Sequence, residues 1–192
     1  ALREAIAMGA DEGYMLSGLE FENSDAHASA IALAAAIRKV GQFDMILCGE
    51  ASEDQYSFQV GPRTAERLNL PQITYAAKIT LENDRVLVDR NLEEYYETVE
   101  SKLPVLITVS REINEPRLPT LMAIMAASKK PMTSWTAGDI GLDMSIGRNG
   151  SLTESLTRAV ASGERKRVLL KGEPREAAER LATALLGDGV VK

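Results

Sequence analysis

The chain has 192 residues, a formal net charge of -6 and an isoelectric point near 5.0. Its length and its hydrophobic fraction of 45% are typical of one packed domain, with room for a small appendage. The acidic balance argues against broad nucleic-acid binding.

The chain has one cysteine, Cys48, and one histidine, His27. No zinc cluster or Ser-His-Asp triad can be assembled convincingly from such a set, and we expect neither. Cys48 lies in an apolar run, so we expect a small buried side chain rather than a reactive thiol. A lone cysteine fits a reducing compartment, and we expect the cytoplasm of a prokaryote or the mitochondrial matrix of a eukaryote. No apolar run approaches the roughly 20 residues that cross a bilayer.

The chain opens in helical spacing, with Leu2, Ala5 and Ile6 on one face and Gly9 after the helix. An α/β domain rarely opens on a helix, so we expect an N-terminal portion to precede Leu2. A strand is predicted over Tyr14–Leu19.

An alanine-rich helix is predicted over Ala26–Val40. Ser24 or Asp25 can cap its start, and Gly41 can close it.

The stretch Asp44–Pro71 predicts a strand, a glycine, a loop and a helix. Met45–Cys48 is a short apolar run typical of a buried strand, and Gly49 ends it. Pro62 is tolerated only near a helix start, which places that start near Phe58–Gly61. With a further strand over Gln72–Ala77, the order of elements implies a parallel, doubly wound α/β sheet.

A helix start offers unpaired backbone N–H groups and the positive end of a dipole, and both favour a phosphate. Gly49 and Gly61 would let a ligand approach the backbone, and Ser57 and Gln59 carry side-chain donors. Carboxylates in the loop suit a ribose hydroxyl better than a phosphate; these are Glu50, Glu53 and Asp54. The pattern therefore predicts a nucleotide site. The alternative is an ordinary strand-to-helix crossover with glycine at a tight turn.

The second half of the chain begins with an antiparallel excursion. Lys78–Leu81 and Arg85–Asp89 flank a good hairpin turn, and Arg90–Ser101 has strand-like character. A buried strand over Val105–Val109 then resumes the sheet.

Leu118–Ala127 is short and apolar, and it is either a core helix or an exposed hook that inserts into another protein. Met132–Gly150 has the composition of a loop. A brief strand over Arg167–Lys171 and an amphipathic helix over Pro174–Leu186 complete the chain. We expect a nucleotide-binding domain over 1–145 and a C-terminal arm over 146–192 that packs on a partner.

Several stretches together resemble the β subunit of electron transfer flavoproteins, including its nitrogen-fixation-linked branch. The resemblance runs from Leu2 to about Gly141 and depends on these segments in this order: Ala5–Asp11, Gly49 with Asp54 and Gln59–Pro62, Val88–Arg90 leading to Glu97, Leu103–Thr108, and Asn114–Arg117. It implies a Rossmann-like fold of the adenine nucleotide alpha hydrolase type, in an electron carrier rather than an enzyme.

The family forms an αβ heterodimer whose redox-active FAD lies mainly on the α subunit. The resemblance implies that this chain binds AMP, or a second FAD as in electron-bifurcating members. Val60 replaces the threonine that AMP-binding members usually have, which leaves only the backbone contact to the phosphate. The implied nucleotide-binding residues are Cys48, Gly49, Asp54, Ser57, Gln59, Val60 and Gly61.

The resemblance also implies protein partners: acyl-CoA or other flavin dehydrogenases as donors, as in fatty acid oxidation, and a quinone oxidoreductase or similar acceptor. The family's docking loop aligns with Arg117–Ala126 and its inserted leucine with Leu121, next to Met122. Glu97 aligns with a glutamate that engages the mobile flavin domain.

This chain departs from the family at Glu94-Tyr95, where glycine is usual, and in the loop Glu53–Phe58. The family's first strands would precede Leu2. Two other protein classes share the sheet architecture. ATP-pyrophosphatase-type ligases need a phosphate loop that this chain lacks, and a universal-stress-like nucleotide-binding module would leave the insertion Val88–Arg117 and the apolar hook unexplained.

Overall fold

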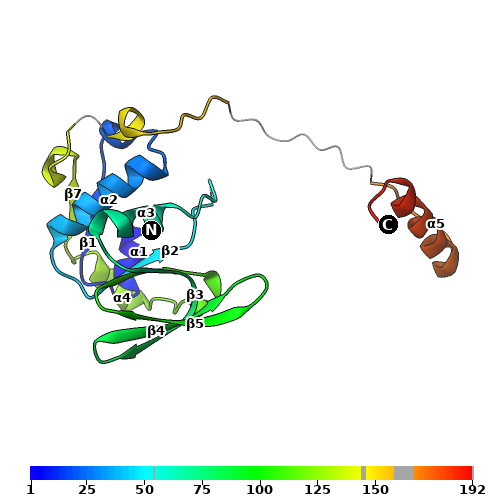
Figure 1. Cartoon of the computed structure of the whole chain (residues 1–192), viewed down its shortest axis with the longest axis horizontal. Helices are drawn as coiled ribbons and strands as arrows, with labels where there is room; N and C mark the ends of the chain where they lie inside the picture. Colours follow the sequence, from blue (N-terminus) through cyan, green and yellow to red (C-terminus); the bar gives the residue numbers. More distant parts are fainter. Residues whose placement is uncertain (54, 144–145, 158–166, 192) are drawn as a thin grey trace. The chain divides into compact units, whose positions relative to one another are not determined.

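A computed structural model describes residues 1–53, 55–143, 146–157 and 167–191 (Figure 1). The chain divides into two compact units, Ala1–Glu154 and Ser155–Lys192. The first unit contains every strand among the described residues. The predicted boundary between residues 145 and 146 stays a prediction.

The larger sheet has five strands in the order β2-β6-β3-β4-β5. Three of its strands, β2 (Met45–Gly49), β6 (Val105–Val109) and β3 (Gln72–Glu82), pair in parallel. The strand β4 (Arg85–Asn91) then pairs antiparallel with β3, and β5 (Tyr96–Lys102) pairs antiparallel with β4. The predicted α/β fold with an antiparallel insertion is confirmed.

The strand β3 joins the parallel part of this sheet to its antiparallel part. Its first residues pair with β6, its later residues pair with β4, and the register shifts between Ala76 and Lys78. The hairpin turn follows Glu82 and places Asn83 at φ 53°, a conformation that asparagine tolerates. The core of the sheet is built from branched and small side chains of its three inner strands, β6, β3 and β4: Ile73, Ala76, Val86, Val88, Val105 and Ile107.

The helix α2 (Ala26–Val40) starts and ends as predicted. The Asp25 carboxylate accepts a hydrogen bond from the Ala28 N–H at 2.9 Å, and Gly41 follows the helix at φ 123°. Alternate alanines of α2 are buried, and the helix packs against α3 (Val60–Leu68). Figure 1 shows these two helices side by side, and α3 also contacts β6 and β3.

The helices α1 (Leu2–Ala7) and α4 (Leu121–Ala127) pack against each other. Their shared cluster is small and contains Ile6, Ala7 and Ala127. Thus α4 is held to the domain through one buried position near its C-terminal end.

The prediction of a loop over Met132–Gly150 is wrong at its start. β7 (Met132–Trp135) pairs in parallel with β1 (Gly13–Leu16) in a separate two-stranded sheet. A strand of four residues with two polar side chains has no clear sequence pattern, and its partner lies more than a hundred residues earlier. β1 is also shorter than predicted, because the 3-10 turn η1 (Leu19–Phe21) follows it.

Three more 3-10 turns complete the first unit: η2 (Arg111–Ile113), η3 (Gly138–Ile140) and η4 (Gly147–Gly150). Ala137 and Ile146, beside η3 and η4, pack with Ala28 and Ala32 of α2 in a second cluster.

The second unit contains α5 (Pro174–Gly187). The prediction of a strand over Arg167–Lys171 is wrong, because these residues form no strand and Val168 and Leu169 are 70% and 82% exposed. A strand needs a neighbour to satisfy its backbone groups. Within the described ranges, no helix has the length and apolar character that spanning a membrane requires.

Candidate nucleotide site and partner-docking surface

The start of α3 lies directly after the carboxyl end of β2 and its loop. Gln59 is the N-cap residue and makes no side-chain hydrogen bond to the helix start. Pro62 has no N–H, so Val60 and Gly61 supply the free donors of the first turn, and neither donates a hydrogen bond within the described part of the chain. This end of the helix therefore has the donors and the dipole for an anion.

The two glycines of the predicted site have different roles. Gly49 is exposed, and a Cβ added there would meet nothing closer than the Ala51 carbonyl oxygen at 3.9 Å. A Cβ at Gly61 would lie 2.5 Å from Cγ2 of Thr108, a buried residue of β6. Gly49 therefore leaves open space above the strand end, whereas Gly61 lets α3 lie close to the sheet.

The polar residues of the loop are only partly available to a ligand. The Gln59 side-chain oxygen accepts from Arg63 Nε at 3.0 Å and from Nη2 at 2.9 Å, so its amide nitrogen is the group left to donate. Ser57 is half-buried at the end of the loop. Asp54 lies outside the described residues.

Phe58, which follows Ser57, stands at the centre of an aromatic cluster, a feature that the sequence analysis missed. The rings of Tyr56 and Phe58 are 5.6 Å apart, and the rings of Phe58 and Tyr75 are 5.8 Å apart. All three residues have positive φ, at 49°, 55° and 59°. Such a backbone costs about 1–3 kcal/mol per residue and is concentrated at functional sites. The signal in the sequence was the spacing of Tyr56 and Phe58 on either side of a serine.

A cavity of about 380 Å³ opens at the carboxyl ends of β2 and β6, and its volume is within the usual range for small-molecule sites. Glu50, which follows β2, and Ser110, which follows β6, both line it. Its other walls come from η2 and from the connection between β4 and β5: Asn91, Leu92, Glu93, Glu94, Tyr95, Tyr96, Arg111 and Glu112. Ligands of open α/β sheets bind outside the carboxyl ends of the strands.

Cys48 lies on β2 immediately before Gly49 and is half-buried. Burial raises the pKa of its thiol. A thiol with a raised pKa is a weak nucleophile, which agrees with the expectation of a packing residue.

The helix α4 is exposed over most of its surface, so it is not a core helix. The side chains of Leu121 and Met122 are 73% and 74% exposed, and Leu118 just before the helix is 91% exposed. The Thr120 hydroxyl caps the helix by accepting from the Ala123 N–H at 3.2 Å. A capped helix with an exposed apolar face has the features of a docking element.

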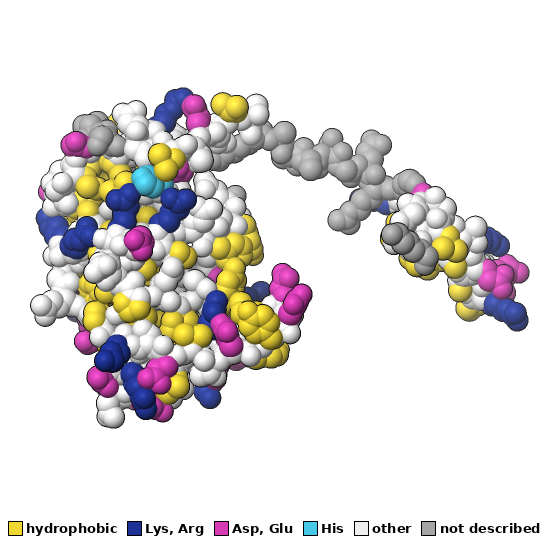
Figure 2. All heavy atoms as spheres, in the orientation of Figure 1, with side chains coloured by type: hydrophobic (Ala, Val, Ile, Leu, Met, Phe, Trp, Pro, Cys, Tyr) yellow, Lys and Arg dark blue, Asp and Glu magenta, His cyan; other side chains and the backbone are white. Residues whose placement is uncertain are grey.

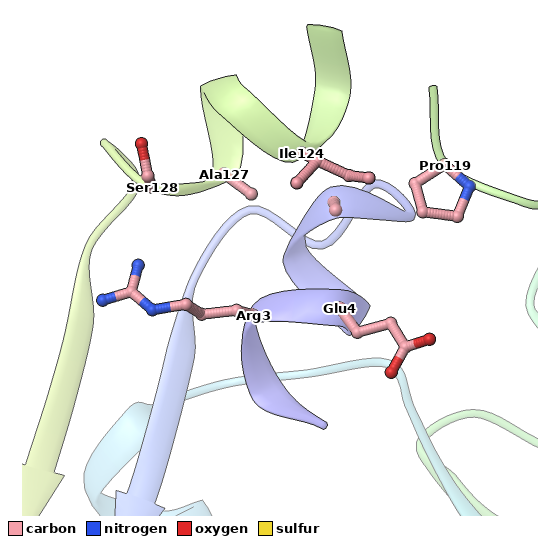
Figure 3. Close-up of a pocket in the computed structure, with 7 residues that line it drawn as sticks. Arg3, Glu4, Pro119, Ile124, Ala127 and Ser128 are labelled. Atoms are coloured by element: carbon pink, nitrogen blue, oxygen red, sulfur yellow. The ribbon is translucent and has the colours of Figure 1, made fainter. Parts of the chain in front are cut away.

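A cavity of about 560 Å³ lies between α1 and α4 (Figure 3). Figure 3 shows Ile124, Ala127 and Pro119 along one wall, with Arg3 and Glu4 extending to opposite sides of α1. The residues that line it are Arg3, Glu4, Ala7, Pro119, Ile124, Ala127 and Ser128. The apolar surface of α4 therefore extends into this cavity.

Two charged residues of the predicted docking surface have different surroundings. Glu97 accepts from Arg90 across the β4–β5 pair, and Arg90 also donates to the Thr74 carbonyl oxygen at 2.6 Å. Arg117 is exposed near Gly9. Glu97 therefore has an internal role in the sheet, whatever it does with a partner.

In the comparison with protein families, residues 1–140 match the electron transfer flavoprotein domain. The match covers the sheet, the α3 start and α4. The chain belongs to the electron transfer flavoprotein family. Its relatives place it with the β subunits, which are electron carriers.

Three relatives are similar over most of the chain. An electron transfer flavoprotein subunit beta of Thermoanaerobacterium thermosaccharolyticum is 41% identical over 187 residues, which are 96% of this chain and 72% of the relative. The caffeyl-CoA reductase-Etf complex subunit CarD of Acetobacterium woodii is 42% identical over 154 residues. A subunit beta from Megasphaera elsdenii is 43% identical over 160 residues. The last two matches each cover 80% of this chain and 59% of the relative, so the chain spans about three-fifths of their length.

Proposed function

We propose that this electron transfer flavoprotein chain binds an adenine nucleotide at the carboxyl end of β2. In this proposal the phosphate accepts hydrogen bonds from the Val60 and Gly61 N–H groups at the start of α3. The sugar lies over Gly49, where the structure is open, and its hydroxyls face Glu50.

The observation that carries this proposal is the combination of an uncapped helix start, which follows β2 and its loop, with a cavity that Glu50 lines at the carboxyl end of β2. Anionic lining residues, such as Glu50 and Glu112, disfavour a phosphate inside the cavity but accept hydrogen bonds from hydroxyl and amino groups. The helix start offers only donors. The two features together match a molecule with one anionic end and one neutral polar end.

AMP and the adenosine end of a second FAD share this chemistry, and both fit the proposal. The replacement of threonine by Val60 leaves the backbone donors as the principal phosphate contact.

We also propose that an α subunit supplies the main FAD, that the exposed face of α4 docks a flavin dehydrogenase, and that α5 packs on the α subunit. The last proposal is supported by the apolar face of α5 that contains Leu181 and Leu185, because no residue of this helix is buried.

The binding test is a calorimetric titration of the purified protein with AMP and with FAD. Gly49→Val fills the open space above the strand end, so it should weaken the binding of the preferred nucleotide at least about tenfold, through steric exclusion. Gly138→Val is the matched control, because Gly138 is exposed and its nearest atom also lies 3.9 Å from an added Cβ. Equal affinity in the two variants would refute the proposed position of the sugar.

A further inference from the structure

A basic cluster lies on the outer faces of α2 and α3. It consists of His27 in the first turn of α2 and of Arg63 and Arg67, one turn apart on α3. Figure 2 shows the histidine with basic side chains on both sides. Arg63 and His27 are half-buried, and Arg67 is exposed.

The imidazole ring of His27 contacts both guanidinium groups. Arg63 Nη1 lies 3.4 Å from Nδ1, and Arg67 Nη2 lies 3.3 Å from Nε2. A neutral imidazole has one acceptor nitrogen, and its other nitrogen carries a hydrogen. In either tautomer, therefore, one guanidinium N–H faces an imidazole N–H, and a protonated ring would present two such contacts. The three side chains cannot satisfy one another.

The two arginines also lack ion pairs. Within the described residues, no carboxylate lies within 4.0 Å of either guanidinium. Arg63 is held by the Gln59 side chain, which is neutral, and Arg67 has His27 as its side-chain partner. Like charges four residues apart on a helix repel by about 0.2–0.5 kcal/mol. An anion bound between the two arginines would offset their repulsion and accept a hydrogen bond from the unmatched N–H group.

A phosphate group has the features that this cluster needs. It carries about two negative charges near pH 8 and three acceptor oxygens, so one group can accept from both arginines and from the imidazole N–H at once. Guanidinium groups bind phosphate oxygens through paired donors. A carboxylate has half the charge and one oxygen fewer.

We propose that Arg63, Arg67 and His27 form a site for a phosphate dianion on the outer surface of α2 and α3. The phosphate comes either as free inorganic phosphate or on a nucleotide. This site lies beside the proposed nucleotide site, because Arg63 donates to the Gln59 side chain, but it binds through side chains, whereas the nucleotide site uses backbone groups of the α3 start.

The test uses the single histidine of the chain as its own probe. The imidazole proton signals of His27 are followed by NMR while inorganic phosphate is added, at about pH 8 and at constant ionic strength set with chloride. Saturable shifts are expected. Arg67→Gln and Arg63→Gln should each weaken phosphate binding about tenfold or more, since each removes a charge-assisted hydrogen bond. Shifts that chloride alone reproduces, or an unchanged affinity in Arg67→Gln, would overturn the proposal.

Two further titrations complete the test. Lys78→Gln removes a positive charge from an exposed side chain of β3, so it should leave phosphate affinity at the wild-type value. AMP, added in place of phosphate, distinguishes the two sources: tighter binding of AMP that depends on Arg67 assigns the site to a nucleotide, and tighter binding of phosphate assigns it to the free ion. A hexaglutamate peptide that binds more tightly than either would contradict a phosphate site. Failure of the Gly49→Val test would leave these results unaffected.

Discussion

Gly61 shows how one residue can belong to a predicted site for a different reason than the sequence indicates. In the sequence it is a glycine at a helix start, where a ligand can approach. In the structure the methyl group of Thr108, on the neighbouring strand β6, occupies the space that a Cβ at Gly61 would need. The glycine therefore sets the distance between α3 and β6, and through it the position of the helix start.

We predict that Gly61→Ala lowers the free energy of unfolding by about 1–3 kcal/mol, because the added methyl overlaps Thr108 Cγ2. Thr108→Ser removes that methyl and keeps the hydroxyl oxygen, which accepts from the Tyr75 N–H at 3.3 Å. The double variant should recover part of the loss in urea unfolding. Strictly additive effects of the two substitutions would show that the two groups do not meet.

Asp25 joins the start of α2 to a distant segment. Its carboxylate accepts from the Ala28, Leu152 and Thr153 N–H groups, at 2.8–3.0 Å, and from the Thr153 hydroxyl at 3.1 Å. Burial by itself raises the pKa of this carboxyl, but these hydrogen bonds outweigh burial and lower the pKa to about 2.

This lowered pKa predicts a pH dependence of stability. Because the folded pKa lies below the ordinary value of 3.8, the stabilisation is complete above about pH 4 and is lost as the pH falls towards 2. Asp25→Asn should reduce the stability difference between pH 6 and pH 3 by less than about 1 kcal/mol, because the full shift contributes about that much over this range and solvent weakens it. Chemical unfolding at both pH values measures it. Asp11→Asn is the control, since Asp11 is exposed and 3.9 Å from Lys130, and an equal reduction there would contradict the assignment.

At the scale of elements, α4 is a capped helix that buries few of its side chains. Its cap and its contact with α1 fix the helix, while most of its apolar side chains face outward. The periodicity of Leu118–Ala127 predicted a helix equally well for a core or a docking role, because periodicity describes one face and not what covers it.

We predict that Leu121→Ala slows electron transfer from a flavin dehydrogenase partner about tenfold, since an anchor side chain contributes more than about 1 kcal/mol to an interface. The free energy of unfolding should change by less than about 0.5 kcal/mol, because the side chain is 73% exposed. Stopped-flow reduction and urea unfolding measure the two quantities. Leu81→Ala, at a 63% exposed position of the hairpin, is the matched control, and equal rates in both variants would remove α4 from the docking surface.

Strong local signals predicted most elements. Asp25 and Gly41 delimited α2, the apolar run at Met45 gave β2, and the turn after Glu82 gave the hairpin. The pairing of β1 with β7 was missed because it depends on residues far apart in the chain. The cluster of Tyr56, Phe58 and Tyr75 and the contacts of His27 were missed for the same reason.

At the scale of the whole molecule, the proposed sites occupy distinct surfaces of an acidic chain. The net charge of -6 makes the basic cluster at Arg63 and Arg67 a local exception. The start of α3, the cavity at the strand ends and the exposed α4 all lie within the first unit, Ala1–Glu154. Nucleotide binding and partner docking are thus proposed for one folded body, which contains the five-stranded mixed sheet and the two-stranded sheet.

The most direct test of the central claim is the identity of the small molecule that accompanies the protein. The purified protein is denatured, and the released compound is identified by mass and quantified against the protein. We predict one adenine nucleotide per chain, AMP or FAD. Folded protein that releases no adenine nucleotide, and binds neither AMP nor FAD when they are added, would contradict a nucleotide site at the start of α3.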